Sequence, residues 1–210
     1  SMLVCRLGYK PSSEADYCPN TPYGKSKVIG EELIRSSNIN FPWVIVRPTS
    51  IWGPWFATPY RDFFDVIRKG LYVHPKGIRV RRSYGFIYNS IFQLSRISDR
   101  LNDELVGKTI YLADYHPIEL KSWSENIQKN LNIRPIREVP IQVFKIAAKL
   151  GDILKNIGYK NPLMSTFRLN NMLTPMEHNT TPLKDYCGDV PYSIDEGVRI
   201  TCEWLQTHKK

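Results

Sequence analysis

The spacing of apolar residues predicts a helix and then a buried strand near the start of the chain. Between residues 22 and 35, apolar side chains recur at helical spacing and stop before a polar Ser-Ser-Asn segment. Pro22 suits the first position of this helix, where no intrahelical N–H bond is needed. Residues 41–48 then form a short apolar run that is typical of a buried parallel strand. The apolar helix positions are Val28, Ile29, Leu33 and Ile34.

The later part of the chain continues these patterns. The pattern of residues 112–117 predicts the end of a strand late in the chain, and that of residues 118–131 predicts a helix with one apolar side. Residues 143–157 predict another helix, which Gly158 ends. With 42% apolar residues in 210, the chain can bury a sizeable core, so an α/β domain is expected.

One residue pair on the first predicted helix carries candidate chemistry. Tyr23 and Lys27 are four residues apart, just over one turn, so both side chains leave the same helix face. A lysine cation beside a phenol favours the phenolate, which can serve as a general base. Tyr72 and Lys76 have the same spacing, but Pro75 disfavours a helix between them. Only the first pair is therefore a catalytic candidate.

Two motifs in this order resemble the extended short-chain dehydrogenase/reductase family, the nucleotide-sugar epimerases, dehydratases and reductases. They are Tyr-x-x-x-Lys at residues 23–27 and Arg-Pro-x-x-[hydrophobic]-[aromatic]-Gly-Pro at residues 47–54. Residues 81–89 are similar to the family's Arg-Asp-[aromatic]-x-x-Val-x-Asp stretch, and residues 192–205 to its closing helix. The resemblance implies an α/β fold: the C-terminal part of a Rossmann-like doubly wound parallel sheet with a smaller mixed α/β substrate-binding domain.

The resemblance also implies how the chain divides. Residues 1–55 and about 84–116 would be the remnant of the NAD(P)-binding Rossmann domain, and residues 56–83 and 117–210 the substrate-binding domain. The family's Gly-rich dinucleotide turn has no match among the 12 glycines. We therefore expect a C-terminal part that lacks the N-terminal dinucleotide-binding half and is inactive alone.

The resemblance assigns catalytic roles to three residues. Tyr23 would exchange a proton with a sugar hydroxyl or keto group, while Lys27 would support it and hydrogen-bond the nicotinamide ribose. Ser1 would hold the reacting oxygen. The implied reaction is epimerisation or 4-keto reduction of a nucleotide-linked sugar with NAD or NADP. Dehydration is disfavoured, because Met2 and Leu3 stand where 4,6-dehydratases of the family carry an Asp-Glu pair.

Binding roles follow in the same way. Tyr23, Lys27 and the four residues after the predicted strand would contact NAD or NADP, and Ser50 and Arg82 would contact the nucleotide-sugar substrate. Ser50 replaces an Asn of many relatives, and Ser83 replaces the family's Asp. These two departures support an alternative, a non-catalytic binding or assembly module derived from the family. The four residues after the strand are Pro48, Thr49, Ser50 and Ile51.

The charge and the cysteines limit other functions. A formal charge of +9 invites a nucleic-acid partner, but the basic residues are scattered and no nucleic-acid motif appears, so none is expected. Four cysteines without Cys-x-x-Cys or His spacing predict reduced thiols in a cytoplasmic protein and no metal site. No stretch could span a bilayer, so no membrane partner is expected. Faces left uncovered by the absent half make a homo-oligomer a reasonable expectation.

Overall fold

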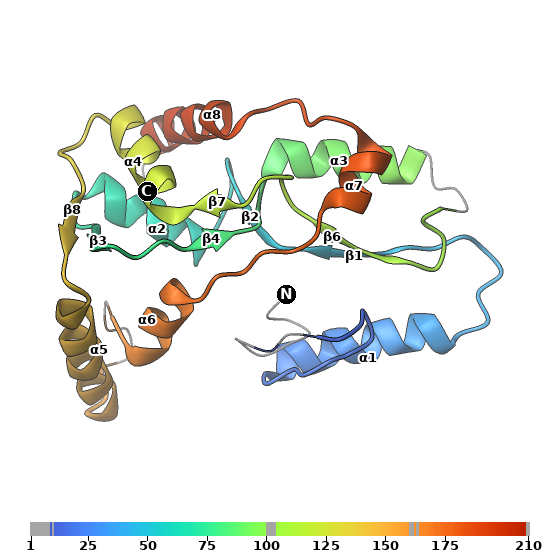
Figure 1. The fold of residues 1–210 in the computed structure, drawn as a ribbon, viewed down its shortest axis with the longest axis horizontal. Coiled ribbons are helices and arrows are strands. Elements are labelled where there is room, and N and C mark those ends of the chain that lie inside the picture. The colour runs from blue at the N-terminus through green and yellow to red at the C-terminus, as the bar shows by residue number, and fades with distance from the viewer. Residues whose placement is uncertain (1–8, 10, 100–103, 160–161, 163, 209–210) are drawn as a thin grey trace. The chain divides into compact units, whose positions relative to one another are not determined.

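The computed structural model describes residues 9, 11–99, 104–159, 162 and 164–208 (Figure 1). The chain divides into two compact units, each assembled from separated stretches. The first unit comprises Ser1–Pro54, Ser83–Pro117 and His178–Gly197, and the second comprises Trp55–Arg82, Ile118–Glu177 and Val198–Lys210.

The first unit is built on two pairs of parallel strands. Strand β1 pairs with β6, with Ile45 opposite Thr109, and β2 pairs with β5, with Ser50 opposite Tyr84. The predicted helix from Pro22 and the predicted strand ending at Pro48 are both confirmed. The elements are α1 (Pro22–Ser36), β1 (Ile45–Pro48), β2 (Ser50–Trp52), β5 (Tyr84–Phe86), α3 (Ile87–Asp99), β6 (Thr109–Leu112) and α7 (Thr181–Cys187). Helix α8 (Ile194–Thr207) begins here.

Helix α7 contributes to the core of the first unit. Leu183 and Cys187 of α7 are buried in one cluster with Ile97 of α3 and with Ile110 and Leu112 of β6. Residues 178–197 therefore belong to the first compact unit. The reason is the apolar side chains of α7, which lose their contact with water only against α3 and β6. The division into an NAD(P)-binding and a substrate-binding domain stays a prediction.

A glycine after β2 explains one position of the Arg-Pro motif. Gly53 has φ of +130°, a backbone conformation that residues with a side chain rarely adopt. A Cβ atom at this position would lie 2.6 Å from Cγ2 of Ile87, the first residue of α3. The turn between β2 and the following Pro54 thus requires glycine for its conformation and for its close packing.

The second unit combines short strand pairs with helices. Strand β3 pairs in parallel with β8, and β4 pairs antiparallel with β7. The predicted helices over residues 118–131 and 143–157 are confirmed as α4 and α5 within a few residues, and Gly158 follows α5 with φ of +97°. The elements are α2 (Tyr60–Arg68), β3 (Val73–Pro75), β4 (Arg81–Arg82), β7 (Ile118–Glu119), α4 (Leu120–Asn130), β8 (Arg137–Val139), α5 (Ile141–Asn156) and α6 (Thr166–Leu173).

Two features of this unit bear on the sequence motifs. Residues Val73–Pro75 form strand β3, so Tyr72 and Lys76 do not share a helix face, as predicted. Helices α5 and α6 pack side by side over a small core of Phe144, Ala148 and Leu169 (Figure 1).

Within the described ranges, no helix combines the length and the apolar character needed to cross a bilayer. Nor do three or more His, Cys, Asp or Glu side chains in this part of the chain gather as a metal site would require.

Candidate functional site

Tyr23 and Lys27 share one exposed face at the start of α1. The helix begins with Thr21, whose side-chain oxygen accepts a hydrogen bond of 3.0 Å from the N–H of Gly24. Lys27 Nζ lies 5.1 Å from the centre of the Tyr23 ring, and the Tyr23 side chain is 57% exposed. The structure therefore brings together the phenol and the ammonium that the sequence pairs.

The four predicted cofactor contacts follow β1 at its carboxyl end. Thr49 donates two hydrogen bonds to the carbonyl oxygen of Leu112, from its N–H at 3.0 Å and its hydroxyl at 3.1 Å. Ser50 and Ile51 are half-buried in β2, and Pro48 ends β1. Ligands of parallel α/β sheets bind beyond the carboxyl ends of the strands, and Pro48 and Thr49 lie at that end of β1. Ser1, the third predicted catalytic residue, lies outside the described residues.

A buried ion pair fastens α1 to β1. Arg47 of β1 donates two hydrogen bonds to the carboxylate of Glu31 on α1, from Nε at 2.9 Å and from Nη2 at 2.6 Å. Burial favours the neutral form of Glu31, but the hydrogen bonds and charge of Arg47 outweigh it and lower the Glu31 pKa. Since Tyr23 and Lys27 precede Glu31 on the same helix, the ion pair ties the helix that carries them to β1.

Aromatic side chains surround this ion pair. Tyr17 donates to Glu31 Oε2 at 2.9 Å, and Arg47 Nη1 donates to the Tyr111 hydroxyl at 3.2 Å. The His178 ring stacks on Tyr111 with ring centres 4.1 Å apart. Burial and the positive charge of Arg47 lower the His178 pKa to about 4, so this imidazole is neutral at pH 7.

The sequence analysis did not identify Glu31 and Arg47 as a positioning pair, although two signals were available. Glu31 is four residues after Lys27, one further turn along the same helix. Arg47 lies inside an apolar run, and a buried arginine requires an acidic partner. What the sequence lacks is any local sign that these two residues meet.

Arg82 has protein partners in the second unit. Its Nη2 donates to the carbonyl oxygens of Asn171 and Thr174, the latter at 2.9 Å, at the C-terminal end of α6. A cation there is stabilised by the carbonyls that the helix leaves unpaired. The next residue, Ser83, belongs to the first unit and accepts a hydrogen bond of 2.9 Å from the N–H of His178 in that same unit. A substrate contact of Arg82 stays a prediction.

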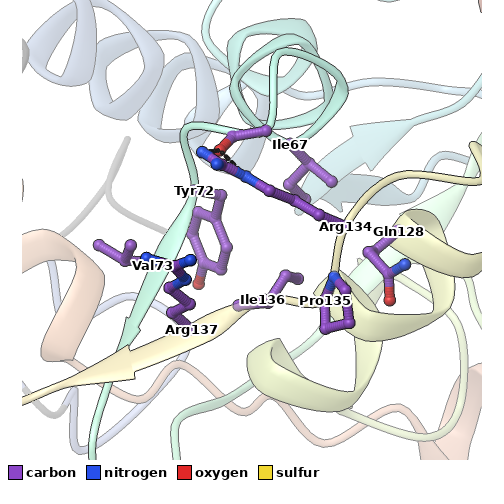
Figure 2. A pocket seen from close by; sticks show the side chains of 9 residues that line it. Ile67, Tyr72, Val73, Gln128, Arg134, Pro135, Ile136 and Arg137 are labelled. Atoms are coloured by element: carbon purple, nitrogen blue, oxygen red, sulfur yellow. Dashed lines mark hydrogen bonds between the residues drawn. The ribbon is translucent and has the colours of Figure 1, made fainter.

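A small hollow in the second unit contains none of the predicted site residues. It lies between the turn after α2, strand β3 and the segment that follows α4, and its lining is shown in Figure 2. Arg134 extends across it and donates to the carbonyl oxygen of Gly70, with Nη2 at 2.6 Å. The arginine is thus used to hold the turn after α2.

A buried carboxylate follows β6 in the first unit. Asp114 accepts hydrogen bonds from Asn89 Nδ2 at 2.9 Å and from the N–H of Phe86 at 3.0 Å. Asn89 also exchanges two hydrogen bonds with the backbone of Tyr192, at 2.9 and 3.1 Å. Burial raises the Asp114 pKa to about 6, against the opposing effect of both hydrogen bonds.

This carboxylate gives a testable pH dependence. A folded pKa above the ordinary 3.8 means that the folded state binds the proton more tightly, so Asp114 contributes stability below about pH 4 that is lost as the pH rises through about 6. Relative to Asp114→Asn, the wild type should lose about 2 kcal/mol of unfolding free energy between pH 4 and 7. Urea unfolding across this range measures the difference. Asp185→Asn, an exposed change on α7, should show no such trend, and a pH-independent difference for Asp114→Asn would contradict the assignment.

Residues 9–94 match the model of an NAD-binding family described as male sterility protein. No curated protein sequence matches the chain. Among solved structures, UDP-glucuronic acid 4-epimerase from Bacillus cereus, in complex with UDP-glucuronic acid and NAD, matches with a TM-score of 0.63 and 16% identity over 99% of this chain and 60% of that one.

Two further structures have the same fold. TunA, an NAD-dependent NDP-hexosamine 5,6-dehydratase involved in tunicamycin biosynthesis, matches with a TM-score of 0.60 and 17% identity over 96% of this chain and 59% of that chain. RMD from Pseudomonas aeruginosa, complexed with NADPH, matches with a TM-score of 0.63 and 14% identity over 96% and 63%. The chain spans less than two thirds of each structure, and the likeness confirms the predicted Rossmann-like α/β fold.

Proposed function

We propose that this chain belongs to the extended short-chain dehydrogenase/reductase family and that the complete protein is an NAD(P)-dependent epimerase or 4-ketoreductase of a nucleotide-linked sugar. The match of residues 9–94 to an NAD-binding family model and the fold shared with nucleotide-sugar enzymes support this proposal. The observation that carries the proposal is the placement of Lys27 Nζ 5.1 Å from the Tyr23 ring, on a helix that Glu31 and Arg47 fasten to β1. This is the arrangement a sugar hydroxyl needs to lose a proton at a defined place.

The residues of this chain would handle the proton. Tyr23 Oη would accept the proton from a sugar hydroxyl or donate it to a keto oxygen. In both directions the positive charge of Lys27 would stabilise the negative charge on the deprotonated Tyr23 oxygen. When bound, NAD or NADP supplies hydride transfer at the carbon that bears this oxygen. Ser1 would hold the same oxygen.

The exposed donor set suits the nicotinamide end of the cofactor. Lys27 is exposed and has three N–H donors, which match the hydroxyl oxygens of a ribose. Pro48, Thr49, Ser50 and Ile51 would line the same end from the carboxyl side of β1. For the substrate we propose contacts from Ser50 and Arg82, because a guanidinium suits the phosphates of a nucleotide sugar.

The alternative is a non-catalytic binding or assembly module, and one observation supports it. Ser83 replaces an acidic residue of the family, and its hydroxyl accepts a backbone hydrogen bond from His178. A homo-oligomer and a cytoplasmic location are also proposals. Exposed Ile29 and Leu33 on α1 support the former.

Cofactor binding and turnover by the complete protein test the proposed function. We expect calorimetry to detect binding of NAD or NADPH, and nuclear magnetic resonance to detect an epimer or a 4-reduced product from UDP- or TDP-linked hexoses. If the complete protein binds neither cofactor, it is the non-catalytic binding or assembly module described above. A protein that yields an unsaturated sugar is a dehydratase, and either result overturns the proposal.

A further inference from the structure

Helix α5 has two apolar sides, and only one of them is covered. Phe144, Ala148 and Gly151 face the core beside α6 and are buried. A second row of large apolar side chains recurs at intervals of three and four residues and is 51–75% exposed. We call this row the α5 stripe. Its members are Val143, Ile146, Leu150, Ile153 and Ile157.

Exposed lysines accompany the stripe. Lys145, Lys149 and Lys155 point into solvent, and in the described part of the chain none of them forms an ion pair. On a helical projection Lys149 borders the stripe, and Lys145 lies one turn before it. The single acidic residue of α5 is Asp152, whose carboxylate accepts from the N–H of Thr166 at 3.2 and 3.3 Å. The exposed part of the helix is therefore apolar and cationic.

We propose that the α5 stripe lies on the surface of a lipid bilayer that contains anionic headgroups. A helix of 16 residues is about 24 Å long, so it can lie in the interface with its apolar side chains between the headgroups. The lysine stems lie along the apolar edge and bring their ammonium groups to the lipid phosphates. In this arrangement α5 lies on the bilayer surface and does not span the bilayer. No helix among the described residues could span one.

The charge pattern favours lipid over a second copy of the chain. If two copies paired through this stripe around a two-fold axis, Lys149 near the middle of one helix would approach Lys149 of the other. Within α5 itself the one acidic side chain, Asp152, accepts hydrogen bonds from the N–H of Thr166, so α5 offers no second carboxylate to offset this repulsion. Anionic lipid satisfies the lysines and the apolar row together.

The proposal uses only residues of the second unit and does not depend on Tyr23 or on any cofactor. Its test is flotation of the wild-type protein with vesicles of phosphatidylcholine that contain phosphatidylglycerol, compared with vesicles of phosphatidylcholine alone. We expect binding to the anionic vesicles only, weakened by salt. Ile146→Asp with Ile153→Asp should abolish it, and Lys145→Glu with Lys149→Glu should weaken it about tenfold or more.

Matched controls distinguish binding through the α5 stripe from nonspecific adsorption through other exposed residues. Ile29→Asp with Leu33→Asp removes two similarly exposed apolar residues from α1, and Lys108→Glu with Lys129→Glu makes the same charge change elsewhere. Both controls should float like the wild type. All variants change exposed side chains, and unchanged thermal unfolding verifies that they fold.

Three results would overturn the proposal. The first is a wild-type protein that floats with neither the anionic nor the phosphatidylcholine vesicles. The second is equal loss of flotation in the α1 control, which would mean that the α5 stripe has no special role. The third is a dimer in light scattering that Ile146→Asp with Ile153→Asp dissociates, because the stripe would then pair two copies.

Discussion

Replacing Tyr23 with phenylalanine should reduce turnover by the complete protein about 10²–10⁴-fold, the range that a lost general acid–base group typically costs. The change removes only the hydroxyl, and the ring that lies beside Lys27 stays in place. Binding of NAD or NADPH should therefore persist nearly unchanged. Steady-state kinetics with the nucleotide sugar and calorimetry with the cofactor measure the two effects separately.

The control for this variant is Tyr159→Phe, because Tyr159 is exposed to the same extent as Tyr23, at 57%, but lies in the second unit. It should retain wild-type turnover. Lys27→Ala should lower turnover and also weaken cofactor binding, since the ammonium is proposed to serve both. Normal turnover in Tyr23→Phe would remove the tyrosine from the mechanism.

Replacing Glu31 with alanine should destabilise the protein by about 3–5 kcal/mol, because it leaves the buried guanidinium of Arg47 without its carboxylate. Arg47 would keep its hydrogen bonds to Tyr111 and to the carbonyl oxygen of Glu14, and neither of these partners carries a negative charge. Urea unfolding followed by circular dichroism gives the free-energy difference. In the complete protein, a loosened α1 should also lower turnover, since Tyr23 is on the same helix.

The neighbouring residue offers the control for this change. Glu32→Ala removes the same charge from the next position of α1, which is exposed, and should alter stability by about 0.5 kcal/mol or less. Adding Arg47→Met to Glu31→Ala should recover part of the loss, because the unpaired charge is then gone. If Glu31→Ala and Glu32→Ala unfold alike, the ion pair contributes nothing.

The sequence predicted the features that depend on neighbouring residues. Pro22 and the residues after it define α1, the apolar run before Pro48 defines β1, and the four-residue spacing places Lys27 beside Tyr23. In each case the physical signal, a helix period or a buried strand, is contained in a few adjacent positions. These predictions are confirmed for that reason.

Features that join distant residues could not be predicted in the same way. Glu31 meets Arg47 across 16 positions, and Arg82 meets the end of α6 across about ninety. Helix α5 shows a subtler limit, because two of its sides are apolar and periodicity cannot tell which one is covered. The structure buries the side with small residues, where a Cβ atom at Gly151 would lie 1.7 Å from the carbonyl oxygen of Met164. The row of large residues, which resembles a core face in sequence, is the exposed one.

The division of both units into separated stretches sets the order in which a ribosome can complete them. Leu183 and Cys187 fill a core whose other walls, α3 and β6, are synthesised about seventy or more residues earlier. Until the segment with α7 has left the ribosome, the side chains of Ile97, Ile110 and Leu112 lack the apolar contacts that Leu183 and Cys187 supply. Release of a truncated chain before residue 178 would leave both units without one of their stretches, so we expect such a product to aggregate or to be degraded.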